Sequence, residues 1–135
     1  MLHRLLTILA VSTVLGCGAG TGLTPNAPKE ATPKLAELRD LLVEATGSPP
    51  LKKQTDMDQF KNRYPSAVQG VADGSLSYVW GASIKEGVGA QSAIIAYETV
   101  AESQGGWVVR ESSAIEKLSL EDFKKEAPKK VVPKK

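Results

Sequence analysis

Two glutamates and a set of aromatic side chains have the types and spacing that carbohydrate hydrolysis would require. Glu98 ends an apolar run, and either Glu111 or Asp73 could supply a second carboxylate. A retaining glycosidase holds its two carboxyl groups about 5 Å apart. Aromatic rings that could stack on a sugar are Tyr78, Trp80 and Trp107. This pattern would suit a small carboxylate-dependent hydrolase acting on envelope glycan, which is the alternative to a non-catalytic role.

The competing interpretation of the same residues is structural. Tyr78, Trp80 and Tyr97 would fill the core of a sheet, and buried tyrosines find a partner for their hydroxyl. Glu98 would then be a surface residue or a hydrogen-bond acceptor at the end of a strand. We expect this second interpretation to hold, and therefore expect no catalytic residues.

Histidine and cysteine chemistry is confined to the start of the chain, because His3 is the only histidine and Cys17 the only cysteine. Removal of an N-terminal signal would leave the rest of the chain without a Ser-His or Cys-His pair, a thiolate metal ligand or a disulfide. We therefore predict no metal and no cofactor, and we do not expect an enzyme.

An export signal is indicated by the first 16 residues. Arg4 precedes an apolar run from Leu5 to Leu15, which is shorter than the ~20 residues of a membrane-spanning helix. The run ends in Val14-Leu15-Gly16-Cys17.

This tetrad resembles the lipobox of bacterial lipoproteins. The resemblance implies cleavage before Cys17, attachment of diacylglycerol to its sulfur, and anchoring at a membrane of the cell envelope. The other interpretation is an ordinary secretory signal cleaved near Ala19 to Thr21, which would release a free secreted binding protein.

Composition divides the remainder into three parts. Residues 17–33 are rich in Gly, Thr, Ala and Pro and are predicted to form a flexible tether, residues 34–127 a small domain, and residues 128–135 a disordered Lys/Pro tail. Leu35 to Asp122 holds 13 acids against 8 Lys and Arg, whereas Phe123 to Lys135 holds six lysines and one glutamate.

The basic end has two interpretations, a solvated solubilising end or a contact with anionic envelope polymer or lipid. Its lysines are Lys124, Lys125, Lys129, Lys130, Lys134 and Lys135. Nucleic acid is not expected as a partner, because the signal exports the chain. No feature of the sequence points to a particular protein partner.

The elements expected to position these residues are helices first and strands later. Thr32-Pro33 begins a helix with leucines on one face that ends at Gly47, and Thr55 begins a second helix that runs to Pro65. A hairpin follows, with strands over 68–72 and 75–81 joined by Asp73-Gly74.

Further strands are predicted over 92–97, 107–111 and 114–118, with a turn at 104–106, before a short helix capped by Ser119. The expected fold is α+β, with N-terminal helices packed on an antiparallel meander of about four to five strands and a short C-terminal helix.

A diffuse resemblance covers most of this domain. The pieces that carry it include Tyr64-Pro65, Val79-Trp80-Gly81, Ala96-Tyr97-Glu98 and Gly105-Gly106-Trp107-Val108. They are similar to a group of small planctomycete lipoproteins, and the last third is similar to the end of prepilin-like proteins. Ser112-Ser113 stands where the prepilin-like proteins have Asp-Gly. The resemblance implies a helix-plus-sheet fold and no assigned activity.

The sequence thus predicts a membrane-tethered cell-envelope lipoprotein whose small α+β domain has a non-catalytic, interaction or structural role.

Overall fold

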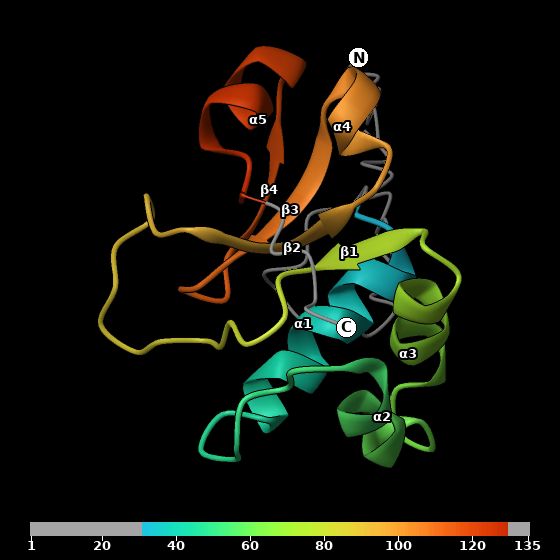
Figure 1. The fold of residues 1–135 in the computed structure, drawn as a ribbon. Helices are drawn as coiled ribbons and strands as arrows, with labels where there is room; N and C mark the ends of the chain where they lie inside the picture. The colour runs from blue at the N-terminus through green and yellow to red at the C-terminus, as the bar shows by residue number, and fades with distance from the viewer. Residues whose placement is uncertain (1–30, 130–135) are drawn as a thin grey trace, which may run out of the picture.

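The computed structural model describes residues 31–129, which form five α-helices, one 3₁₀ turn and a four-stranded sheet (Figure 1). In chain order these elements are α1 (Pro33–Glu44), α2 (Gln54–Met57), η1 (Asp58–Phe60), α3 (Pro65–Ala72), β1 (Leu76–Tyr78), β2 (Ile94–Glu98), α4 (Ala101–Gln104), β3 (Gly106–Arg110), β4 (Ile115–Leu118) and α5 (Leu120–Glu126).

The sheet is an antiparallel meander in the order β1-β2-β3-β4, so each strand pairs with its neighbours in the sequence. A bulge between Ile94 and Ala96 interrupts the register of β2 with β3. The α+β class is confirmed, with four strands, N-terminal helices and a short C-terminal helix.

α1 begins where the sequence predicts. The Thr32 side chain accepts a hydrogen bond from Leu35 N at 3.4 Å. Pro33 occupies the first helical turn, where a backbone N–H has no partner within the helix, so the lack of an N–H on proline costs nothing. Leucines recurring at three- and four-residue intervals bury one side of the helix against the sheet: Leu35, Leu38, Leu41 and Leu42.

The predicted hairpin around Asp73-Gly74 is wrong, because residues 65–72 form α3 and only residues 76–78 form a strand. Pro65 favours a helix start, and Ala67, Val68 and Val71 recur at helical spacing, so their apolar side chains share one side of α3. Gly74, at φ +81°, follows the helix and reverses the chain into β1.

The second predicted helix is shorter than expected. It begins at Gln54 instead of Thr55, and its backbone changes to a 3₁₀ turn at Asp58. The capping carboxylate is that of Asp56, which accepts hydrogen bonds from Lys52 N and Lys53 N at 2.9 and 3.2 Å. Met57 and Phe60 are buried, as their spacing indicates.

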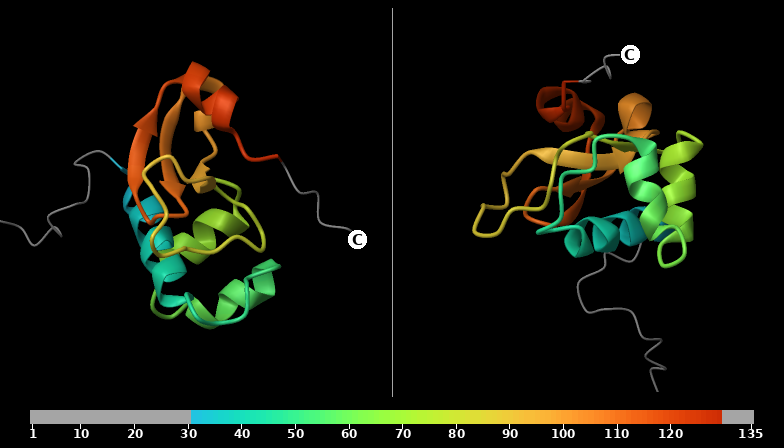
Figure 2. Two further views of the ribbon diagram at one scale, coloured as in Figure 1. Left: turned by 90° about the vertical axis from the view of Figure 1, so that its left-hand side faces the viewer. Right: turned by 60° about the horizontal axis from the view of Figure 1, so that its bottom comes forward.

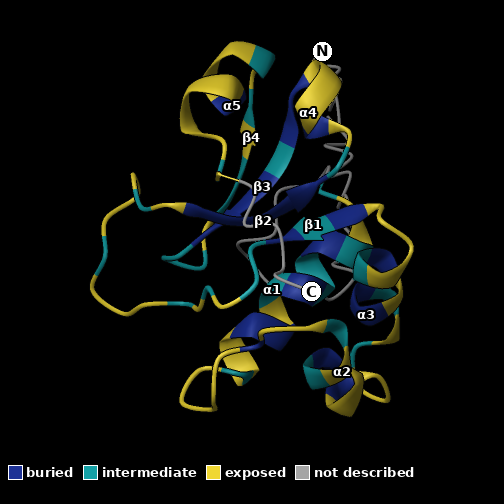
Figure 3. Ribbon diagram, viewed as in Figure 1, coloured by how far each residue is buried: buried dark blue, intermediate teal, exposed yellow. Residues whose placement is uncertain are grey.

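Two apolar clusters lie on opposite faces of the sheet (Figures 2 and 3). The larger one joins α1, α2 and α3 to one face and includes Tyr78, with Trp80 packed at its margin. The smaller cluster lies under α4 and α5 and contains Ile94, Tyr97, Ala101, Val108 and Phe123. The prediction that Tyr97 shares a core with Tyr78 and Trp80 is therefore wrong, since β2 presents Tyr97 to the other face.

A short helix, α4, occupies part of the predicted β2–β3 turn. Gly105 ends it at φ +77° and ψ 167°, a conformation that essentially only glycine adopts. A Cβ at this position would lie 2.6 Å from Leu118 O, so the close approach of the β4–α5 junction also requires glycine.

Candidate functional site

Glu98 lies at the end of β2, on the sheet face that α1 covers. Its side chain is largely buried, and Oε1 accepts a hydrogen bond from Thr32 N at 3.2 Å. The N-terminal end of a helix carries partial positive charge, so a carboxylate beside the start of α1 is favourable. Glu98 is thus a hydrogen-bond acceptor at a strand end that connects the sheet to the first helix.

Glu111 lies at the opposite end of the same strand pair. Its backbone N–H donates to Ala93 O at 2.9 Å, and its carboxylate pairs with Lys85 Nζ at 2.7 Å. Ala93 and Glu98 are separated by the length of β2, roughly 15 Å at the rise of an extended strand. The structure therefore does not bring Glu98 and Glu111 to the about 5 Å of a retaining pair, nor to the about 6.5–9.5 Å of an inverting pair.

Asp73, the other candidate acid, is held in the turn after α3. Its Oδ1 accepts from Ser75 N at 2.8 Å, and Oδ2 lies 3.8 Å from Lys34 Nζ. Hydrogen bonding from Ser75, followed by the charge of Lys34, lowers the pKa of Asp73. A lowered pKa keeps Asp73 ionised near neutral pH, and its two oxygens are occupied by Ser75 and Lys34.

Each candidate aromatic side chain contacts another part of the fold. Tyr78 and Trp80 meet edge to face, with centroids 5.1 Å apart, and the Tyr78 hydroxyl donates to Ala82 O. Burial raises the pKa of Tyr78 to about 12. Trp107 lies on β3, with Lys117 Nζ 5.9 Å from its ring centroid. On the other face the Tyr97 hydroxyl donates to Glu102 Oε1 at 2.9 Å.

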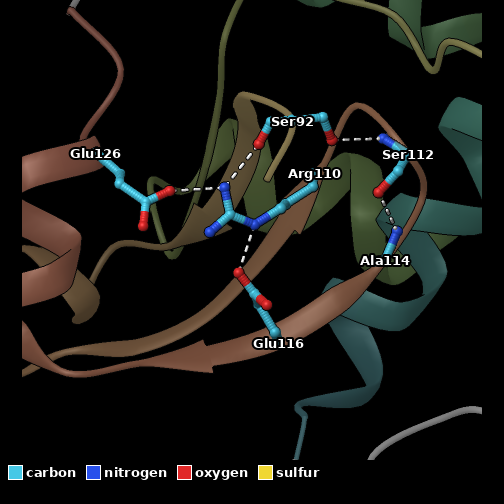
Figure 4. Close-up of polar contacts among 6 residues, drawn as sticks. All are labelled: Ser92, Arg110, Ser112, Ala114, Glu116 and Glu126. Carbon is cyan, nitrogen blue, oxygen red and sulfur yellow. Dashed lines mark hydrogen bonds and ion pairs between the residues drawn. The ribbon is translucent and has the colours of Figure 1, made fainter. Parts of the chain in front are cut away.

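A buried arginine that the sequence reasoning missed joins four segments (Figure 4). The Arg110 side chain is only 2% exposed. Its Nε donates to Glu116 on β4, and one terminal guanidinium nitrogen lies 2.7 Å from Glu126 Oε2 on α5. The same nitrogen donates to Ser92 O at 2.6 Å, just before β2.

The two carboxylates stabilise the cationic form of Arg110. The hydrogen bond to Glu126, followed by the contact with Glu116, raises the pKa of Arg110 above its usual value. A buried arginine with two carboxylate partners and one carbonyl partner satisfies its charge internally. The sequence does contain an indication that Arg110 is buried. Arg110 stands two residues after the apolar Val108, and residues two apart lie on the same face of a strand.

The candidate lysines within the described chain are solvent-exposed. Lys124 and Lys125 lie in the last turn of α5, and Lys129 follows it. The Ser119 hydroxyl caps α5 by accepting from Asp122 N at 3.1 Å, as predicted. Lys130, Lys134, Lys135 and the candidate lipidation residue Cys17 lie outside the described residues.

The described surface has shallow hollows, and three of them lie near the residues discussed above. Two adjoin one another at the C-terminal end of α1 and share Thr46 and Ile84; one reaches Tyr78 and the other reaches Lys85 and Ser113. The third lies beside Glu98 and is mostly apolar, with Leu76 and Val100 in its lining. Within residues 31–129, no group of three or more His, Cys, Asp or Glu side chains could hold a metal ion.

Comparison with known proteins gives no relative: no family model matches the chain, and no similar curated protein or solved structure was found. Among the helices of residues 31–129, none has the length and apolar character needed to cross a membrane.

Proposed function

We propose that this protein is a membrane-tethered lipoprotein of the cell envelope, in which a small α+β domain has a non-catalytic, interaction or structural role. The location is inferred from the lipobox-like Val14-Leu15-Gly16-Cys17. The role of the domain is inferred from the contacts of its chemically versatile side chains.

The observation that carries the proposal is that these side chains connect one element to another. Glu98 connects β2 to the start of α1, and Arg110 connects β3 to α5. Tyr78 connects β1 to the chain that follows it through Ala82. Groups with such partners stabilise the fold, and the separation of Glu98 from Glu111 supports the same interpretation over a carboxylate hydrolase.

Intact-mass spectrometry of the processed protein tests the proposal. We expect an N-terminus at Cys17 carrying diacylglycerol, and recovery of the protein with membranes. Cys17→Ala should accumulate as an uncleaved precursor, because the acylated sulfur would be missing. An unmodified N-terminus between Ala19 and Gly22 would replace the lipoprotein with a secreted binding protein.

A further inference from the structure

α5 is attached to the sheet by few side chains. Phe123 is its one buried residue, and it meets Tyr97 edge to face with ring centroids 5.0 Å apart. Glu126 adds an ion pair to Arg110 at 2.7 Å, although its own side chain is 36% exposed. The neighbouring strand β4 contributes no fully buried residue. A unit with so few buried contacts opens at a lower free energy than the core of a domain.

The rest of the domain is stabilised by contacts on the opposite face of the sheet. The larger apolar cluster lies there, between the strands and the first three helices (Figure 2). α5 has seven residues, and an isolated helix of that length is not stable in water. The single residue Ser119 connects it to β4. Release of Phe123 and Glu126 should therefore unfold α5 while the sheet and the larger layer stay folded.

Arg110 keeps two partners when α5 is released. Its Nε donates to Glu116 on β4, and a terminal nitrogen donates to Ser92 O at 2.6 Å (Figure 4). Neither partner belongs to α5, so the guanidinium stays oriented after Glu126 leaves. The sheet contributes three apolar side chains to the smaller cluster, and these would be uncovered on the same face: Ile94, Tyr97 and Val108. Release of α5 would thus expose a fixed guanidinium beside an apolar surface.

α5 itself shows which ligand this surface fits. Phe123 and Glu126 are three residues apart, so both project from one side of the helix. The aromatic ring packs on the apolar surface, and the carboxylate makes a charge-assisted hydrogen bond with the guanidinium. A ligand with a cation in place of Glu126 would meet the charge of Arg110 and be repelled.

We propose that α5 is a displaceable cover, and that the surface it vacates binds a helix of a protein partner that carries an aromatic residue followed three positions later by an acid. The proposal rests on the interaction role proposed above, and it requires no lipid anchor. The partner's helix would take the place of α5, so binding and opening would be coupled.

Hydrogen exchange of the processed protein, in non-ionic detergent, tests the opening. Ile95→Val alters the larger cluster and should speed exchange of the β2 and β3 amides roughly two- to tenfold, without affecting the α5 amides. Glu126→Gln should speed exchange of the α5 amides roughly fivefold. If Ile95→Val accelerated α5 and β3 equally, α5 would open only with the whole domain, and the proposal would be wrong.

Binding of a synthetic peptide with the sequence of residues 119–129 tests the site. The peptide should bind the Phe123→Ala protein, whose own α5 is weakly docked, roughly tenfold or more tightly than it binds the original protein. Glu126→Gln keeps the aromatic anchor and is expected to stay folded, and it should tighten peptide binding by a smaller factor. The control peptide carries both substitutions, Phe123→Ala and Glu126→Gln, and should bind none of the three proteins.

Equal binding of the two peptides would overturn the proposal, and so would a lack of binding to both protein variants. Either result would leave an interaction role at another surface, so it would not by itself contradict the proposed function. The mass of the N-terminus is measured separately, so a failure of the lipoprotein proposal would be recognised independently.

Discussion

At the scale of single residues, Arg110 joins parts of the chain that are far apart in sequence. Its partners lie before β2, on β4 and at the end of α5, and the guanidinium is buried among them. A buried charge is costly unless it is paired, so each contact depends on the others.

Arg110→Met should lower the free energy of unfolding by about 3 kcal/mol, because it leaves two carboxylates beside an apolar side chain. Glu126→Gln should cost less, about 1 kcal/mol, since Glu126 is partly solvated and Glu116 still pairs with Arg110. Urea denaturation measures both changes. Arg63→Met is the control, because Arg63 pairs with Glu44 at an exposed position, and a loss there equal to that at Arg110 would contradict this account.

Tyr78 should make stability fall at alkaline pH. Its pKa in the folded protein is about 12, against about 10 in an unfolded chain, so folding favours the protonated hydroxyl. This contribution is complete below about pH 10 and is lost as the pH rises toward 12, by up to about 2–3 kcal/mol.

Tyr78→Phe should remove that part of the alkaline loss, at a cost near neutral pH of about 1 kcal/mol for the missing hydrogen bond to Ala82 O. Denaturation midpoints between pH 8 and 11 provide the measurement. Tyr64→Phe, which removes a hydroxyl that donates to Glu44 Oε2 at an exposed position, serves as the comparison and should leave the alkaline loss in place. Identical pH profiles for Tyr78→Phe and the original protein would rule out Tyr78 as the source.

At the scale of elements, the β4–α5 junction depends on Gly105. Gly105→Ala should destabilise the domain by at least about 1–3 kcal/mol from backbone strain, with a further loss from the contact between the new Cβ and Leu118 O. Gly87 has a similar positive φ of 72°, but a Cβ there would meet no atom within 4 Å, so Gly87→Ala should show only the smaller strain cost. Thermal unfolding of the two variants separates the cost of the contact with Leu118 O from the cost of backbone strain. Equal losses of stability in the two variants would show that the contact with Leu118 O is unimportant.

The elements that the sequence predicts well are those with long patterns and clear ends. α1 has four buried leucines and a Thr-Pro start, and the strands from Ile94 onward are separated by short connections. The strand predicted over residues 68–72 is wrong because a five-residue segment with only three apolar side chains is too short to distinguish a strand from a helix. In addition, Pro65 can end one helix or begin the next.

The candidate site was predictable only in part. Because β2 and β3 form a hairpin, Glu98 must lie near the connection and Glu111 near the open end, so their separation follows from the predicted strands. The partners of Arg110 do not follow in this way. Glu126 reaches Arg110 only because Phe123 docks α5 on the sheet, and that packing is a tertiary event.

At the scale of the whole molecule, the sheet separates two layers of helices of unequal size. α1, α2 and α3 cover one face with most of the buried leucines, whereas α4 and α5 cover the other with a cluster of five buried residues. α5 belongs to the smaller layer, and its attachment to the sheet depends on Phe123 and the Arg110–Glu126 pair. The larger layer carries the start of α1, where the proposed tether joins.

The sheet also has an open boundary at β4, which pairs only with β3 among the described strands. Residues opposed in an antiparallel pair project to the same face, so a two-fold pairing of two copies through β4 that is centred on Glu116 or on Lys117 would place that residue opposite its own copy. Like charges directly opposed across strands are destabilising. In these two registers the charged side chains of β4 would keep two molecules from joining their sheets edge to edge, as charged edge strands do in many soluble proteins.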